Sequence, residues 1–150
     1  MARLDVRLLE DGLDPAAAYA VFDRAEGSAG AVVSFTGVVR GESGAVDYLF
    51  LDWYPGMTEA SLQEIAEAAA QRFDITALSV LHRCGKVMAG ETIVFVAAAS
   101  AHRRAAFEAA DYAMDRLKSE AALWKREAGR DGEHWVEPRA ADAKDLKRWT

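Results

Sequence analysis

Residues 75–99 read ITALSVLHRCGKVMAGETIVFVAAA and hold two apolar segments joined by a short connection. Residues 75–83 and 91–99 are rich in β-branched and other apolar side chains, which is typical of strands, and the second segment is apolar enough to be central in a sheet. Gly85 and Gly90 bracket the connection, which is too short to contain a crossover helix. We therefore expect an antiparallel arrangement in this part of the fold.

Further strands are expected on both sides of this stretch, where apolar and polar side chains alternate or turn signals bound β-branched runs. They cover residues 4–8, 31–40, 46–54, 123–127 and 134–137. Gly37 interrupts the second of these strands, which indicates a bulge or a close backbone approach. The last two strands flank Asp131-Gly132, a pair that is typical of hairpin turns.

Three helices are predicted from apolar side chains that recur at three- and four-residue steps. The first covers residues 16–25, the second begins at Thr58, and the third begins at Ser100 and runs for about five turns. Thr58 and Ser100 are the expected N-caps, because their hydroxyls can accept from free backbone N–H groups. A short helix is expected over residues 140–149.

Helices and strands mix along the chain without strict alternation, which predicts an α+β fold. We expect a mainly antiparallel sheet, packed helices and a C-terminal hairpin. At 150 residues the chain fits a single domain over residues 1–150. A domain of this size buries about two thirds of its unfolded surface, so no disulfide is needed to hold it together.

The overall charge limits the partners of this chain. A formal net charge of -6 repels polyanions, so neither nucleic acid nor an anionic membrane surface is an expected partner. The single cysteine, Cys84, cannot form an internal disulfide. The sequence has no charged and then apolar leader and no apolar run of about 20 residues. A cytoplasmic location is therefore expected.

Positive charge is concentrated in one segment. Residues 100–130 hold seven Lys or Arg against five Asp or Glu, whereas residues 1–99 hold seven against fourteen. Lys118 and Lys125 lie in this segment, seven residues apart. A continuous helix would place them on the same face, about 10 Å apart, and a strand beginning near Leu123 would bring them closer. Either geometry allows the two side chains to share a small anion.

The chemistry of such a lysine pair depends on its surroundings. A lysine that lies near another cation, or is partly withdrawn from water, has a lowered pKa, which suits proton transfer or nucleophilic attack. Two exposed lysines without a function are the alternative, and residue type alone favours that alternative.

A second basic group follows Ser100 directly, where His102, Arg103 and Arg104 fall in the first turn of the predicted helix. The free N–H groups of a first turn already favour anions, so added cations suit either an anion site or a solvated basic turn. From His102 to Lys118 is sixteen residues, or roughly 24 Å along a helix. One small ligand cannot reach both, so the two groups belong to separate sites or meet across a symmetric dimer.

Three further features could belong to a functional site: a strand-end arginine, the single cysteine and two histidines. Arg40 ends a predicted strand at a glycine-rich loop, where an arginine can hold a phosphate or can simply be exposed. Basic residues flank Cys84, which lowers a thiol pKa, but no catalytic Cys-His signature surrounds it and an inert thiol is favoured. His82 and His134 lack companions at zinc-ligand spacing, so no metal is expected.

Five motifs occur in one order along the chain: FTGVVR at residues 35–40, YPGMTE at 54–59, SAHR at 100–103, Lys118, and WKRE at 124–127. In this order and spacing they resemble the large, catalytic subunit of molybdopterin synthase, from about residue 30 to Trp149. Val38 departs from the family pattern, where a lysine is common, and Ala122 stands where a proline often precedes the aromatic residue.

The resemblance implies an α/β-hammerhead fold and a sulfur transferase. That family converts a cyclic pyranopterin monophosphate to molybdopterin in molybdenum cofactor biosynthesis. The sulfur comes from the C-terminal Gly-Gly thiocarboxylate of a small ubiquitin-like partner subunit. The family's assembly is a heterotetramer, in which a homodimer of large subunits carries a small subunit at each end. The resemblance implies no cofactor and no metal for the transfer itself.

The same resemblance assigns roles to individual residues. Lys118 and Lys125 are expected to be catalytic. The residues expected to bind substrate are Val38, Val39, Arg40, His102, Arg103, Arg126 and Glu127. In the family the His-Arg pair reaches the site of the neighbouring subunit, which agrees with the length of the predicted helix.

Two other classes of function stay open on the sequence. A non-catalytic phosphate-binding or regulatory domain would use the same basic pocket and release its ligand unchanged. A thiol enzyme centred on Cys84 would lose activity when that thiol is alkylated.

Overall fold

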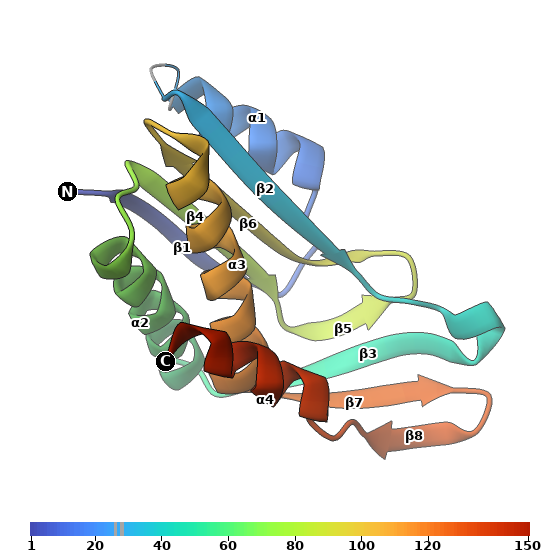
Figure 1. The fold of residues 1–150 in the computed structure, drawn as a ribbon. Helices are drawn as coiled ribbons and strands as arrows, with labels where there is room; N and C mark the ends of the chain where they lie inside the picture. Colours follow the sequence, from blue (N-terminus) through green and yellow to red (C-terminus); the bar gives the residue numbers. More distant parts are fainter. Residues whose placement is uncertain (26, 28) are drawn as a thin grey trace.

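The computed structural model describes residues 1–25, 27 and 29–150. Within these residues four α-helices pack on eight strands, which form two four-stranded sheets (Figure 1). The predicted α+β class, the mainly antiparallel pairing and the C-terminal hairpin are confirmed. None of the described helices is long and apolar enough to cross a membrane.

The first sheet, sheet A, has the strand order β1-β4-β6-β2. Its strands are Arg3–Leu9 (β1), Ala77–Arg83 (β4), Thr92–Ser100 (β6) and Ala31–Val38 (β2). β1 pairs parallel with β4, whereas β6 pairs antiparallel with both of its neighbours. The antiparallel pair β4–β6 is the one expected from the opening stretch of sequence.

The second sheet, sheet B, has the order β5-β3-β7-β8 and is antiparallel throughout. Its strands are Gly85–Met88 (β5), Val46–Trp53 (β3), Leu123–Gly129 (β7) and Gly132–Trp135 (β8). The chain passes from sheet A to sheet B at Cys84, between β4 and β5. Figure 1 shows sheet B extending from one end of sheet A.

The helices are Pro15–Ala25 (α1), Met57–Arg72 (α2), Arg103–Glu120 (α3) and Ala140–Leu146 (α4), with short 3-10 turns at Glu42–Gly44 and Lys147–Trp149. α2 and α3 cover one face of sheet A, where Leu62 and Ile65 pack with Leu78, Val80 and Val96. α1 covers the other face. α4 lies against α3 (Figure 1).

The junction of the two sheets has its own small core. Val39, Val46, Leu51 and Val87 are buried there, and Leu49 and Leu123 pack against them. The interruption predicted at Gly37 is confirmed, because the register of β2 shifts between Gly37 and Val38. A Cβ at Gly37 would also stand 2.6 Å from a methyl carbon of Val94, so neighbouring side chains fill the space that a side chain at Gly37 would need.

The connection expected between Gly85 and Gly90 instead contains strand β5. Gly85 has a φ of +77°, a conformation that glycine adopts without strain, and this allows the chain to turn out of sheet A immediately after β4. The short connection predicted from sequence therefore contains an edge strand of sheet B.

Neither expected N-cap has that role in the structure. Ser100 is the last residue of β6, where it pairs with Ala31, and its hydroxyl donates to the carbonyl of His102. His102 is the N-cap residue of α3 but makes no side-chain capping bond. Thr58 lies inside α2, and its hydroxyl accepts from the N–H of Tyr54 at 2.9 Å. Both hydroxyls thus bond to the backbone of the segments that connect a strand to a helix, and neither caps a helix.

Candidate functional site

Lys118 and Lys125 lie on two consecutive elements. Lys118 is an exposed residue in the last turn of α3, which ends at Glu120, and Lys125 lies on β7, which begins at Leu123. The second of the two geometries considered for the pair is therefore the observed one. The helix ends between the two lysines, and the chain turns back along sheet B.

The link between the lysines is fastened to α2. Thr58 donates its hydroxyl to the carbonyl of Ala122 at 2.7 Å, and the N–H of Ala122 donates to Ser61 at 3.0 Å. Thr58 is fully buried. A buried side chain with two hydrogen bonds holds its partners more firmly than an exposed one. This role of Thr58 was not predicted, because its place in the sequence suggests only a helix cap.

Lys125 points toward the interior side of sheet B. It pairs in register with Leu51, which is fully buried, and Leu123 packs on the same core cluster. Paired residues and alternate residues of a sheet share a face. We call this the inner face of sheet B, and the opposite side its outer face. Glu127 falls on the inner face by the same alternation, opposite His134 and 3.6 Å from its ring nitrogen Nε2.

The surroundings of Lys125 change its acidity. Burial, followed by the positive charge of Lys118, lowers the pKa of Lys125 to about 8, against a smaller opposing effect of Asp142. Lys125 is half-buried, so its ammonium has lost part of its hydration without gaining an ion pair among the described residues. A lysine in this state can hold an anion when charged and can release or accept a proton near neutral pH.

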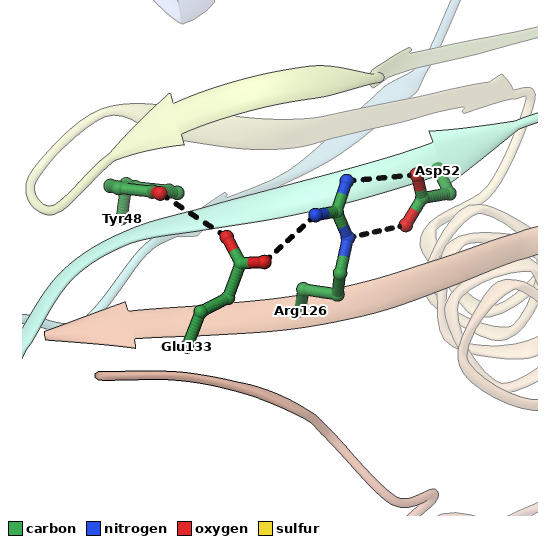
Figure 2. Close-up of polar contacts among 4 residues, drawn as sticks. All are labelled: Tyr48, Asp52, Arg126 and Glu133. Atoms are coloured by element: carbon green, nitrogen blue, oxygen red, sulfur yellow. Dashed lines mark hydrogen bonds and ion pairs between the residues drawn. The ribbon is translucent and has the colours of Figure 1, made fainter. Parts of the chain in front are cut away.

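Arg126 follows Lys125 directly but lies on the outer face. Its guanidinium donates two hydrogen bonds to Asp52, at 2.8 and 3.0 Å, and a third to Glu133 at 2.8 Å. Figure 2 shows this arrangement, in which Tyr48 also donates to Glu133. These carboxylates raise the pKa of Arg126. The guanidinium also stacks over Phe50, 4.4 Å from its ring centre, so its charge is already matched within sheet B.

The three residues expected to bind substrate at the end of β2 differ in exposure. Val38 is 50% exposed, whereas Val39 is buried in the junction core and its N–H and carbonyl bond to Glu91 and Gly90. Arg40 is 79% exposed at its side chain and lies 3.7 Å from Glu42. Of these three residues, Arg40 therefore presents a largely exposed cation, with Glu42 as a neighbour at ion-pair distance.

His102 and Arg103 lie at the start of α3, the opposite end from Lys118. Together with Arg104, Ala101, Gly30 and Ala31 they line a cavity of 410 Å³. A Cβ at Gly30 would stand 2.1 Å from the carbonyl oxygen of Ala101, so only glycine fits beneath this turn. The structure does not bring His102 and Arg103 together with the lysine pair of the same chain.

Cys84 and a second cavity lie outside the groups described so far. Cys84 is fully buried, and burial raises the pKa of its thiol to about 11, so the lowered pKa considered from its basic neighbours is wrong. A cavity of 530 Å³ lies near Leu13, Asp14 and Arg83, at a place where no site was expected. Among the described residues no group of three or more His, Cys, Asp or Glu could hold a metal ion.

The sequence matches a known protein family and several of its named members. A family model described as MoaE protein matches residues 8–120. The molybdopterin synthase catalytic subunit of Caulobacter vibrioides is 46% identical over 144 residues, which cover 96% of this chain and 96% of that protein.

Solved structures of similar proteins have the same fold. A molybdopterin biosynthesis MoaE protein from Burkholderia ambifaria superposes with a TM-score of 0.80 at 37% identity, over 99% of this chain and 98% of that one. Molybdopterin synthase from Staphylococcus aureus gives a TM-score of 0.76 at 32% identity, over 87% and 95%. The resemblance drawn from the five motifs is thereby confirmed, and the chain belongs to the MoaE protein family.

Proposed function

We propose that this chain is the catalytic subunit of a molybdopterin synthase. It converts a cyclic pyranopterin monophosphate to molybdopterin, with sulfur supplied by the C-terminal thiocarboxylate of a small ubiquitin-like partner. The observation that carries the proposal is the lysine pair. Lys125 is half-buried, and its pKa is lowered by burial and by the charge of Lys118. Relatives of this chain are named molybdopterin synthase catalytic subunit.

The lysine pair supplies the reacting end of the site. The thiocarboxylate of the partner is an anion, and the charged form of Lys125 attracts it into a partly dehydrated place where the attraction is strong. Lys118 is placed to stabilise charge, or to move a proton, as sulfur adds to the substrate carbon and water leaves. Glu127, on the same face as Lys125, is proposed to contact the substrate.

The phosphate end of the substrate needs fixed cations, and Arg40, His102 and Arg103 are the groups proposed to hold it. Because α3 separates His102 from Lys118 by roughly 24 Å, His102 and Arg103 serve the lysine pair of a second protomer. The functional unit is then a homodimer of this chain with one small subunit for each site. Val39 positions Arg40, and the exposed Val38 lines the approach.

The substrate-binding role expected for Arg126 stays a prediction. It would require the guanidinium to leave Asp52 and Glu133, or the substrate to reach the outer face. We further propose that residues 1–150 fold as one domain and that the protein works in the cytoplasm, where the reduced thiol of Cys84 needs no protection.

The proposal is tested with the purified chain, a thiocarboxylated partner subunit and the pterin substrate. Product is followed by mass spectrometry, which also reports loss of sulfur from the partner. We expect Lys118→Ala to abolish most of the conversion, whereas Lys144→Ala, at an exposed position on α4, leaves it intact. Substrate that binds tightly and emerges unchanged would favour the alternative, a non-catalytic phosphate-binding domain.

A further inference from the structure

Arg83 is a buried cation without a counterion. It is the last residue of β4, and only 4% of its surface is exposed. Among the described residues no carboxylate lies at ion-pair distance from its guanidinium. Charged side chains are almost never fully buried unless they are paired, because burial removes their hydration. The contacts of each nitrogen of this guanidinium are therefore informative.

The hydrogen bonds of Arg83 use one nitrogen only. Nη2 donates to the carbonyl oxygens of Glu10 and Lys86, at 3.1 and 3.0 Å. Nε is sealed from water and has no hydrogen-bond partner in the part of the chain that the structure describes. No described residue accepts from Nη1 either. The two carbonyls orient the guanidinium, but its positive charge has no anionic acceptor.

The cavity of 530 Å³ adjoins this guanidinium. Arg83 lines it, and the other lining residues include Gly12, Asp14, Gly90 and Glu91. A Cβ at either glycine would meet no atom within 4 Å, so open space adjoins both. The volume falls within the range of small-molecule sites, roughly 300–1,000 Å³. None of the lining residues belongs to the lysine pair or to the groups proposed to hold the pterin phosphate, so this is a separate place in the molecule.

The lining also carries two carboxylates, from Asp14 and Glu91. Oδ1 of Asp14 accepts from the N–H groups of Ala16 and Ala17, at 3.0 and 3.3 Å. Oε1 of Glu91 accepts from the N–H of Met88 at 2.7 Å. These bonds fix one oxygen of each carboxylate, and no residue with a described position donates to the second oxygen. The cavity therefore combines one unmatched cation with two carboxylates that can still accept.

This pattern of charge selects among small ligands. The planar fork of a guanidinium matches a carboxylate, which it can bind through two parallel hydrogen bonds. The charges of Asp14 and Glu91 oppose any anion, and they oppose a phosphate dianion more than a carboxylate. They attract an ammonium group on the same ligand. A molecule with one carboxylate and one ammonium therefore complements the lining better than a simple anion does.

We propose that this cavity is a binding site for a free amino acid. The carboxylate of the ligand pairs with Arg83, and its ammonium lies toward Asp14 and Glu91. Such a ligand gives the buried guanidinium the acceptor that it lacks and offsets part of its lost hydration. The site goes beyond the proposed sulfur transfer and does not depend on it.

The first test observes Arg83 in the intact wild-type protein. Its buried Nε–H is protected from water, so it should give a ¹H–¹⁵N signal that through-bond spectra assign. Titration with glycine, L-alanine and L-lysine should shift this signal to a plateau for at least one of the three. Sodium acetate and inorganic phosphate, at matched ionic strength, should bind about fivefold more weakly or less, because they lack the ammonium.

The second test removes the charges of the two carboxylates and keeps their hydrogen bonds. Asp14→Asn and Glu91→Gln retain an oxygen that accepts from the same backbone N–H groups. Combined in one protein, they should weaken binding of the amino acid about fivefold and strengthen binding of acetate. Glu64→Gln, at an exposed position of α2, is the matched control and should change neither.

A third variant, Arg83→Met, removes the cation and should abolish saturable binding, which calorimetry can follow. Retained binding in the folded variant would overturn the role of Arg83. If this variant does not fold, the first two tests still decide, because neither substitutes Arg83.

The remaining outcomes are equally definite. The absence of a saturable shift at Arg83 with all three amino acids overturns the site. Acetate or phosphate that binds as tightly as the amino acids overturns the class of ligand. None of these measurements uses sulfur transfer, so an inactive lysine pair and an empty cavity are separate results.

Discussion

Lys125 and Arg126 are adjacent cations on one strand, yet their side chains lie on opposite faces of sheet B. Lys125 lies on the inner face, half-buried, and its pKa is lowered to about 8 by burial and by Lys118. Arg126 lies on the outer face between Asp52 and Glu133, which raise its pKa (Figure 2). One cation is left open to an outside anion, and the other is neutralised by its own chain. Adjacency in a motif is thus a poor guide to a shared site when the motif forms a strand.

The largest expected effect concerns Arg103, which is proposed to act with the lysine pair on the inner face of a second protomer. If Arg103 serves the lysine pair of a second protomer, Arg103→Ala and Lys118→Ala should each lose activity by about 100-fold. Mixed and reassociated, the two proteins form dimers in which one site carries both substitutions and the other carries neither. Random mixing then restores about one quarter of the wild-type sites. Activity that stays at the level of the separate variants would place Arg103 and Lys118 in one chain's site.

A smaller effect should appear in stability, because the inner face holds a charge that the fold disfavours. Below about pH 8 Lys125 is charged in both states, and its burial costs the folded state. Lys125→Met should therefore stabilise the protein by about 1–3 kcal/mol at pH 7.

The pH dependence of that gain follows from the direction of the shift. As pH rises from about 8 toward the ordinary lysine value, the folded wild-type protein loses its proton first, so the cost shrinks. Denaturant unfolding of both proteins at pH 7 and above pH 10.5 measures the difference. A stability difference that does not change with pH would show that Lys125 is as well solvated as a surface lysine.

On the outer face the opposite behaviour is expected. Arg126→Ala removes the partner of Asp52 and Glu133, so it should lower the melting temperature, which circular dichroism can follow. It should leave the pKa of Lys125, measured from its rate of acetylation across a pH series, unchanged, because the sheet lies between the two side chains. A shift in that pKa would mean that the two faces are electrostatically coupled.

The smallest effect is expected at Cys84. Cys84→Ala removes one buried sulfur, costs about 1 kcal/mol of stability and leaves sulfur transfer unchanged. The buried thiol of the wild-type protein should also react slowly with iodoacetamide, since its pKa is raised to about 11. Loss of turnover in step with alkylation would instead support the thiol enzyme.

Much of this architecture could be predicted from short-range pattern. Alternation and turn residues identify β1, β4, β6 and the hairpin of β7 and β8, and apolar periodicity identifies α1, α2 and α3. The existence of β5 was missed because four residues between glycines carry too little periodicity to distinguish a strand from a turn. The division into two sheets was missed as well, because it depends on the positive φ of Gly85. A glycine permits that conformation, but its presence in the sequence does not show that the conformation is adopted.

The candidate site was predicted in part. The lysine pair and the separation of His102 from Lys118 follow from spacing alone. The opposite faces of Lys125 and Arg126 follow from a strand assignment that was only one of two possibilities. His82 was considered only as a metal ligand, whereas the structure shows a buried ring whose Nδ1 donates to the carbonyl of Arg83.

The central claim is that the inner face of sheet B carries the chemistry and the outer face supports it. The most direct test is single-turnover sulfur transfer from a thiocarboxylated partner to the pterin substrate, measured for Lys125→Ala and Arg126→Ala under conditions where both are folded. We predict a loss of about 100-fold or more for Lys125→Ala and a change of a few fold at most for Arg126→Ala. Equal losses, or a larger loss at Arg126, would contradict the account.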